Sequence, residues 1–178
     1  MDARTSTAAE AGERELVITR IIDAPRHIVF QAWTEPDRVA RWWGPQGFMT
    51  VYHDMDIRPG GAFRVCMRSP EGAEHWKQGV YREVVEPERL VFTFAWEDAD
   101  GKPGHQTLVT VTFAERGDKT ELRLHQAVFE TIARRDEHQH GWTSTLERFA
   151  EYLASAHLPR PPLAGGEGRG EGGGRCIA

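Results

Sequence analysis

The chain has 178 residues, of which 39% are hydrophobic and 28% are charged, and its formal net charge is −5. This length and balance are typical of one globular domain, and no apolar run approaches the ~20 residues that a membrane-spanning helix needs, so we expect no membrane partner. The 22 basic residues are scattered among 27 acidic ones without forming a basic stripe, so we expect no nucleic acid partner either.

Residues 1–13 form a polar, alanine-rich segment that we expect to be flexible. The segment lacks the pattern of a secretory signal, a basic stretch followed by an apolar one, and we therefore expect a cytoplasmic protein. The sequence holds no Asn, and only three of its 22 basic residues are lysines. Because Asn and Lys codons are AT-rich, this composition favours a GC-rich, bacterial genome.

A first strand and two short helices are expected next. Residues 16–22 are aliphatic and β-branched, which favours a strand. Pro25 suits a first helical position, and apolar residues follow it at a spacing of three and four, which predicts a helix. Pro36 begins a second helix in the same way, and this helix must end at Gly44-Pro45.

Residues 47–126 are predicted to form a meander of strands, separated by turn sequences such as Pro59-Gly60-Gly61. Between the turns, apolar residues recur at every second position, as at Phe63, Val65 and Met67. This period of two indicates an antiparallel sheet with one apolar face and one solvated face.

The last regular element is predicted to be an amphipathic helix over about residues 138–156. Its apolar residues are spaced four, three and four apart, at Trp142, Leu146, Phe149 and Leu153. Residues 158–178 are rich in Gly, Pro and Arg, and we expect this tail to be disordered because ordering it would cost about 1–2 kcal/mol of backbone entropy per residue. Cys176 lies in the tail, so no disulfide with Cys66, the other cysteine, is expected.

These elements predict an α+β fold with a curved antiparallel sheet of about six or seven strands. Seven strands at ~4.8 Å spacing make a sheet about 34 Å wide, whereas a helix with its side chains is only ~10–12 Å across. The sheet must therefore curl around the long helix, and the two short helices can close only one end of the trough. We expect a cavity with apolar walls between sheet and helix, and this cavity is the candidate functional site.

The expected lining of the cavity is rich in aromatic rings, which bury a large area and, in Trp and Tyr, carry a polar group that can orient a ligand. The alternative is that these rings fill a solid core. Gln126 and Glu83 are the polar candidates, Glu83 because alternation puts it on the face of Tyr81, although a solvated strand position also explains it. The other candidates are Trp42, Trp43, Phe48, Phe63, Val65, Trp76, Tyr81, Phe92, Phe94, Val109, Val111, Trp142, Leu146 and Phe149.

Several stretches also occur in the order and spacing of a family. They include Asp23-Ala24-Pro25, Val29-Phe30-Gln31-Ala32-Trp33-Thr34, Arg41-Trp42-Trp43-Gly44-Pro45, Pro59-Gly60-Gly61-Ala62-Phe63 and Gly141-Trp142. Over residues 15–154 this arrangement resembles the START-like SRPBCC superfamily, and more narrowly its branch named for homologues of the activator of the heat shock protein 90 ATPase. The resemblance implies a helix-grip fold over residues 14–157, like START and birch-pollen-allergen-like domains. It also implies a hydrophobic cavity, used in different relatives for lipids, polyketides or hormones. Where many relatives have a histidine before the last helix, this chain carries Gln126.

The sequence contains no nucleophile elbow, phosphate-binding loop or zinc-type Cys/His spacing. His138 and His140 are two residues apart, which points them to different sides of a helix. We therefore expect neither a metal nor a cofactor, and we assign no catalytic residue.

The leading interpretation is binding of a small hydrophobic molecule, aromatic, lipid or polyketide-like, in the cavity. Two alternatives from other classes remain. One is a module that binds a chaperone or another protein, in the manner of a chaperone ATPase activator; a homodimer is a further partner option. The other is a cyclase or dehydratase acting on a substrate held in the cavity.

Overall fold

The computed structural model describes residues 12–157. The predicted tail 158–178, and all but the last two residues of the predicted flexible segment 1–13, lie outside this part. Within it, the elements in chain order are β1 (Leu16–Ile22), α2 (Arg26–Thr34), α3 (Pro36–Trp42), β2 (Met49–Met55), β3 (Ala62–Arg68), β4 (Glu74–Val85), β5 (Arg89–Trp96), β6 (Thr107–Arg116), β7 (Lys119–Ala127) and α4 (Ile132–His157).

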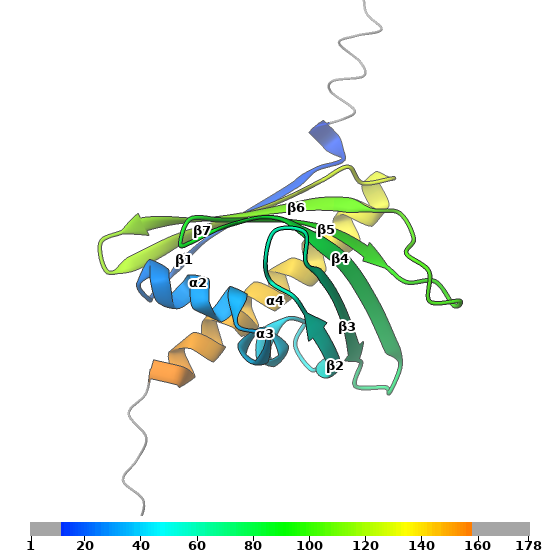
Figure 1. Cartoon of the computed structure of the whole chain (residues 1–178), viewed down its shortest axis with the longest axis horizontal. Helices are drawn as coiled ribbons and strands as arrows, with labels where there is room; N and C mark the ends of the chain where they lie inside the picture. Colours follow the sequence, from blue (N-terminus) through cyan, green and yellow to red (C-terminus); the bar gives the residue numbers. More distant parts are fainter. Residues whose placement is uncertain (1–11, 158–178) are drawn as a thin grey trace, which may run out of the picture.

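The strands that the structure describes form one seven-stranded sheet in the order β1-β7-β6-β5-β4-β3-β2, and all neighbours are antiparallel. The first strand pairs with the last, as in Leu16 opposite Gln126. The sheet is strongly curved around the helices (Figure 1). This arrangement confirms the predicted helix-grip fold, with two short helices after the first strand and a long C-terminal helix.

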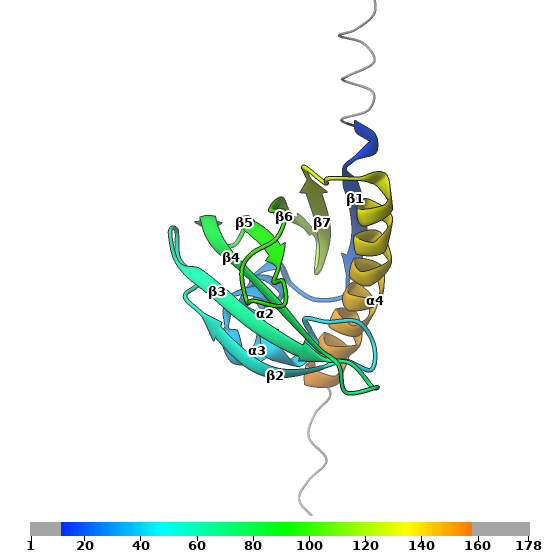
Figure 2. The same cartoon turned by 90° about the vertical axis from the view of Figure 1, so that its right-hand side faces the viewer.

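The helix α4 packs against β1 and against α3, and Figure 2 shows it running beside β1. Its predicted apolar stripe is buried, as expected for an amphipathic helix on a sheet. The helix begins six residues before the predicted start, at Ile132. Residues 132–137 are largely exposed and carry no apolar periodicity that would reveal this first part of the helix. The start is marked instead by an N-cap, because Thr131 Oγ1 accepts a hydrogen bond from the backbone N–H of Arg134 at 3.2 Å.

One half of the space between sheet and helix is filled by aromatic rings. Trp42 lies 4.6 Å from both Trp33 and Phe149, measured between ring centroids, and Trp33 also contacts Phe113 at 6.0 Å. Trp42 and Phe149 have no exposed surface, and the indole N–H of Trp42 donates to the carbonyl of Ala32 at 2.9 Å. The short helices α2 and α3 supply the two tryptophans, so these helices fill space that the long helix alone cannot reach.

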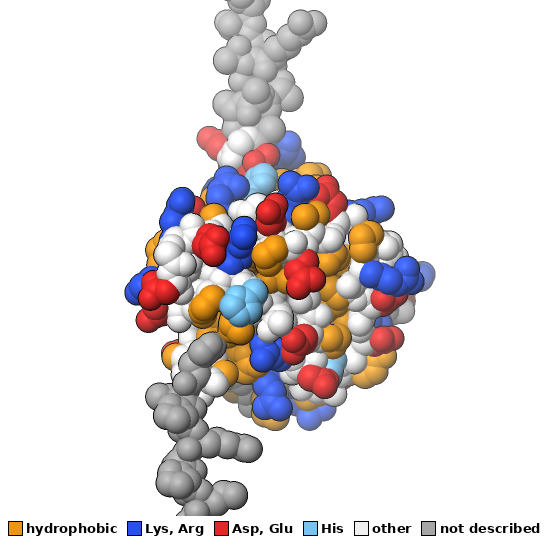
Figure 3. All heavy atoms as spheres, turned by 60° about the vertical axis from the view of Figure 1, so that its left-hand side comes forward, with side chains coloured by type: hydrophobic (Ala, Val, Ile, Leu, Met, Phe, Trp, Pro, Cys, Tyr) orange, Lys and Arg blue, Asp and Glu red, His pale blue; other side chains and the backbone are white. Residues whose placement is uncertain are grey.

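Within residues 12–157, none of the helices combines the length and the apolar character needed to cross a membrane. On the face shown in Figure 3, basic and acidic side chains are interspersed with apolar ones, and charges of one sign do not gather there.

Candidate functional site

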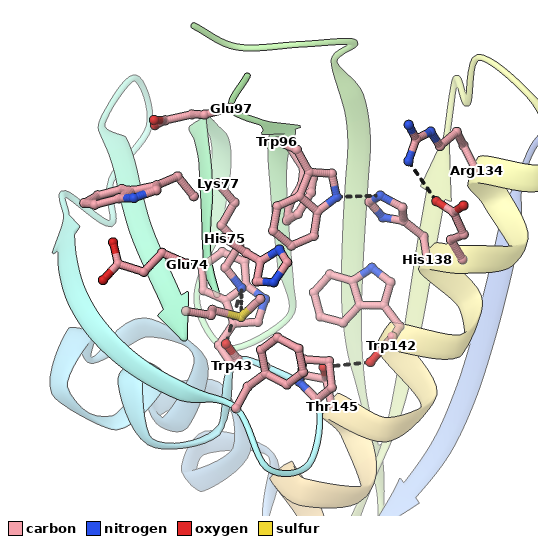
Figure 4. Close-up of a pocket in the computed structure, with 18 of the residues that line it drawn as sticks. Trp43, Glu74, His75, Lys77, Trp96, Glu97, Arg134, His138, Trp142 and Thr145 are labelled. Carbon is pink, nitrogen blue, oxygen red and sulfur yellow. Dashed lines mark hydrogen bonds and ion pairs between the residues drawn. The ribbon is translucent and has the colours of Figure 1, made fainter. Parts of the chain in front are cut away.

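A cavity of about 910 Å³ lies between the first half of α4 and the strands β3, β4 and β5. The loop between α3 and β2, residues 43–48, closes one side of it (Figure 4). The residues that line the cavity are Trp43, Gly44, Pro45, Phe48, Met67, Glu74, His75, Trp76, Lys77, Phe94, Trp96, Glu97, Asp98, Ala99, Arg134, Glu137, His138, Gly141, Trp142 and Thr145.

Several aromatic rings line the inner wall. Trp43 from the loop and Trp142 from α4 are nearly parallel, with centroids 6.5 Å apart and an interplanar angle of 23°. Phe94 and Trp96, both on the inner face of β5, meet edge to face at 5.2 Å. Such rings offer a planar or acyl molecule a large contact area with defined orientation.

A hydrogen-bond network fixes the wall where α4 faces β5. The indole N–H of Trp96 donates to Nε2 of His138 at 3.0 Å (Figure 4). Because an indole can only donate, Nε2 must accept, and Nδ1 carries the proton and donates to Oε1 of Gln126 at 3.2 Å. The same oxygen accepts the indole N–H of Trp142 at 2.7 Å, while the amide nitrogen of Gln126 donates to Thr107 Oγ1 at 2.7 Å.

This network requires a neutral imidazole. Burial lowers the pKa of His138 to about 4; the negative charge of Glu137 opposes the shift, and the positive charges of Arg134 and Lys77 add to it. His138 is therefore neutral near pH 7, in the one tautomer that satisfies both of its ring nitrogens.

Lys77 is a buried basic group of the cavity wall, with only 2% of its surface exposed. Its Nζ donates to the carbonyl oxygen of Trp43 at 3.3 Å and lies 3.4 Å from the sulfur of Met67 and 3.9 Å from the centroid of the Trp43 ring. Figure 4 shows the side chain descending from β4 toward Trp43. Burial, with a smaller contribution from the positive charge of Arg148, lowers the pKa of Lys77 well below its usual value.

The loop 43–48 is held on α4 by Arg148. Its Nη1 donates to the carbonyl oxygen of Phe48 at 2.7 Å and to that of Gly44 at 3.4 Å. Packing at Gly44 is close, since a Cβ at this position would lie 2.8 Å from the sulfur of Met67, and the methionine side chain would have to shift. The aromatic residues of the loop are thus positioned by helix and strand together.

The structure distributes the sequence candidates other than Glu83 over three locations. Trp43, Phe48, Trp76, Phe94 and Trp142 line the cavity. Gln126 is fully buried behind it and orients Trp142 and His138. The remaining apolar candidates are buried in the core beside the cavity; they are Trp42, Phe63, Val65, Tyr81, Phe92, Val109, Val111, Leu146 and Phe149.

Two candidates require a correction of orientation. A β-bulge between Tyr81 and Glu83 breaks the alternation that placed them on one face, and Glu83 is exposed and paired with Arg89 at 2.6 Å, outside the cavity. Trp76 borders the cavity, but its neighbour Lys77 points inward, so its ring lies on the outer face of the sheet, under the guanidinium of Arg64 at 4.1 Å.

Sequence reasoning missed Lys77 and His138 as site residues, although both left a signal. In β4, alternation from Tyr81 through Gly79 puts Lys77 on the inner face, where a lysine is unusual. His138 precedes Trp142 by four residues and so extends the apolar stripe of α4 by one turn. Among residues 12–157, no three His, Cys, Asp or Glu side chains lie grouped as metal ligands would.

A curled antiparallel sheet around a long C-terminal helix, with a cavity between them, defines a helix-grip protein of the START-like SRPBCC type. The model of the family described as Activator of Hsp90 ATPase homolog 1-like protein matches residues 23–154, and the chain belongs to this family.

Solved structures agree with this assignment. The chain is similar to the AHSA1 protein from Silicibacter pomeroyi, with 26% identity, a TM-score of 0.76, and coverage of 80% of this chain and 99% of the other. A protein from Chromobacterium violaceum has 28% identity and a TM-score of 0.70 over 78% of this chain and 95% of the other. A protein from Arthrobacter aurescens, at 20% identity and a TM-score of 0.73 over 90% and 95%, shows the fold alone. A comparison with curated proteins found no match.

Proposed function

We propose that the protein binds one small, mainly apolar molecule, with an aromatic or acyl body, in the cavity between α4 and β3–β5. The observation that carries the proposal is the cavity itself, whose volume of about 910 Å³ is within the ~300–1,000 Å³ of small-molecule sites. Its walls combine stacked and edge-on rings with a few polar groups, the composition that such sites have in general.

The first test is native mass spectrometry of the freshly purified full-length chain. We expect a mass larger than that of the polypeptide by one small molecule, which denaturation releases and which can then be identified. A protein that carries nothing, and that binds no aromatic or acyl compound from a panel, would count against the proposal.

Gly141 offers a matched pair of variants for the second test. It lies on α4 and lines the cavity, and a Cβ built there meets no heavy atom within 4 Å. In Gly141→Phe the ring takes up cavity space, and we expect at least tenfold weaker binding. Gly141→Ala adds only a methyl group and should retain binding, while the loss of a mid-helix glycine stabilises the fold by about 0.5–1 kcal/mol. Equal binding by the two variants would place the ligand elsewhere.

A protein partner is the second candidate function, and a specific surface favours it. β2 is an edge strand of the sheet, and it exposes Met49, Val51 and Tyr52 at 66%, 39% and 44%. An edge with apolar side chains can pair with another chain, either a chaperone of the kind for which the family is named or a second copy of this protein. Light scattering and the ATPase rate of a bacterial 90-kDa heat-shock chaperone, each with wild type and with Val51→Lys, test this candidate.

An enzyme of the cyclase or dehydratase type would need an acid or base inside the cavity. Lys77 and His138 are buried or partly buried titratable groups of the wall whose hydrogen-bonding atoms are engaged by the protein itself. His75 also lines the cavity, at an exposed position of β4. Binding without turnover is the function that we propose, and His75 is the group that an enzyme of this type would use first. Release of an unchanged ligand after prolonged incubation is the expected result, and a changed mass would favour the enzyme.

A further inference from the structure

Lys77 has partners of one kind only. The carbonyl oxygen of Trp43, the sulfur of Met67 and the face of the Trp43 indole all accept hydrogen bonds or attract a cation, and none of them can donate. An amine lone pair would meet no donor among these groups, whereas the three N–H groups of an ammonium each find an acceptor. These acceptors favour the protonated side chain, whereas burial and the positive charge of Arg148 lower the pKa of Lys77 and oppose protonation as long as no anion lies beside it.

The positive charge nevertheless has no counterion in the part of the chain that the structure describes. None of the ion pairs among residues 12–157 includes Lys77. A buried charge without an opposite charge is destabilising, so fully buried lysines are rare unless they are paired.

The carboxylates nearest the cavity do not remove this imbalance, because three of the four acidic lining residues already pair with arginines. The ion pairs are Glu74–Arg68 at 2.8 Å, Glu97–Arg64 at 2.7 Å and Glu137–Arg134 at 2.9 Å. The fourth residue, Asp98, accepts the backbone N–H groups of its own turn, from Asp100 and Lys102. In Figure 4 the side chain of Glu97 points away from Lys77.

We propose that the ligand of the cavity is an organic anion, a carboxylate on an aromatic or acyl body, and that Lys77 binds its carboxylate. This inference deepens the proposed function and depends on it. Two of the three partners of Nζ, a thioether sulfur and a ring face, are weak acceptors, and a carboxylate oxygen can replace either of them. The carbonyl of Trp43 stays in place to orient the ammonium. The apolar body of the ligand then lies against Trp43, Phe94 and Trp142.

The test uses two probes of equal shape that differ in charge, 2-naphthoate and 2-naphthamide, titrated calorimetrically into the full-length protein at neutral pH. We expect naphthoate to bind at least tenfold more tightly than naphthamide. In Lys77→Met, which keeps the length and removes the charge, this preference should disappear while naphthamide still binds. Lys102→Met makes the same exchange at an exposed turn position and should leave the preference unchanged.

Each outcome bears on the inference. Equal affinities in the wild type, a preference for the amide, or a preference for the acid that survives Lys77→Met would overturn it. The ratio of the two affinities in the wild type needs no variant, so the inference stays testable even if Lys77→Met fails to fold. A wild-type protein that binds neither naphthalene probe contradicts the proposed function as well, whereas equal binding contradicts only the anionic ligand.

Discussion

At the scale of single residues, His138 connects the cavity wall to the interior by two hydrogen bonds. One of these bonds needs an unprotonated ring nitrogen and the other needs a protonated one. Nε2 accepts from Trp96, and Nδ1–H donates to Gln126. A second proton on the ring would turn Nε2 into a donor facing the N–H of Trp96, and the wall would lose this bond. The position of Trp96, which is 37% exposed at the cavity margin, therefore depends on the protonation state of His138.

The pH dependence of stability follows from this state. The pKa of His138 is about 4 in the folded protein, and an unfolded histidine titrates near 6.5, so the unfolded chain binds the proton first as pH falls. The neutral His138 therefore contributes to the free energy of unfolding in full above pH ~6.5, and this contribution is lost as the pH falls toward ~4. Between pH 7 and 4.5, urea unfolding should show wild type losing about 2 kcal/mol more stability than His138→Gln. His140→Gln, at an exposed position of the same helix, should behave like wild type, and an unchanged pH slope in His138→Gln would refute the assignment.

At the scale of elements, the loop 43–48 depends on α4 through Arg148. The guanidinium hydrogen-bonds three carbonyl groups of the loop, at Gly44, Pro45 and Phe48. Hydrogen bonds to charged groups contribute about 1.5–3 kcal/mol, so Arg148→Met should lower the free energy of unfolding by roughly 2 kcal/mol. We also expect faster hydrogen exchange in the loop and weaker ligand binding.

Arg38 provides the control for this prediction. It is an arginine on α3 whose partner, Glu35 at 2.9 Å, is half-exposed, and surface ion pairs of this kind contribute about 0–1 kcal/mol. Arg38→Met should therefore leave loop exchange unchanged. If Arg148→Met exchanges its loop amides at the wild-type rate, the loop is held by packing alone.

The elements themselves were predictable where a local periodicity existed. The two proline-initiated helices, the alternation of β3 and β6, and the buried stripe of α4 follow from spacing in the sequence. Positions that depend on a neighbouring strand were not predictable in this way. The bulge in β4 is a property of its pairing with β5, and it moved Glu83 to the solvent without a signal in the sequence of β4 itself.

At the scale of the whole molecule, the comparison of widths predicted a trough larger than one helix can fill. The helices α2 and α3 take up part of this trough, because their Trp33 and Trp42 pack around Phe149 and fill one half of it. The cavity lies in the other half, toward β3–β5. Which rings belong to which half depends on how the sheet curves, a property that no stretch of the sequence specifies by itself.

This division into a filled half and an open half predicts that the same substitution acts differently in the two, mainly on stability in the filled half and mainly on ligand binding in the open half. Phe149 is fully buried between tryptophans, and Phe149→Ala should cost about 3–5 kcal/mol of stability by urea unfolding. Phe48 is half-buried and lines the cavity, so Phe48→Ala should cost less than about 2 kcal/mol. Losing that ring from the wall should, however, weaken naphthoate binding about tenfold, since one ring contact contributes about 1 kcal/mol or slightly more. Phe149→Ala, assayed where it is still folded, should bind naphthoate nearly as wild type does. Equal losses of stability in the two variants would mean that the cavity half is as tightly packed as the core.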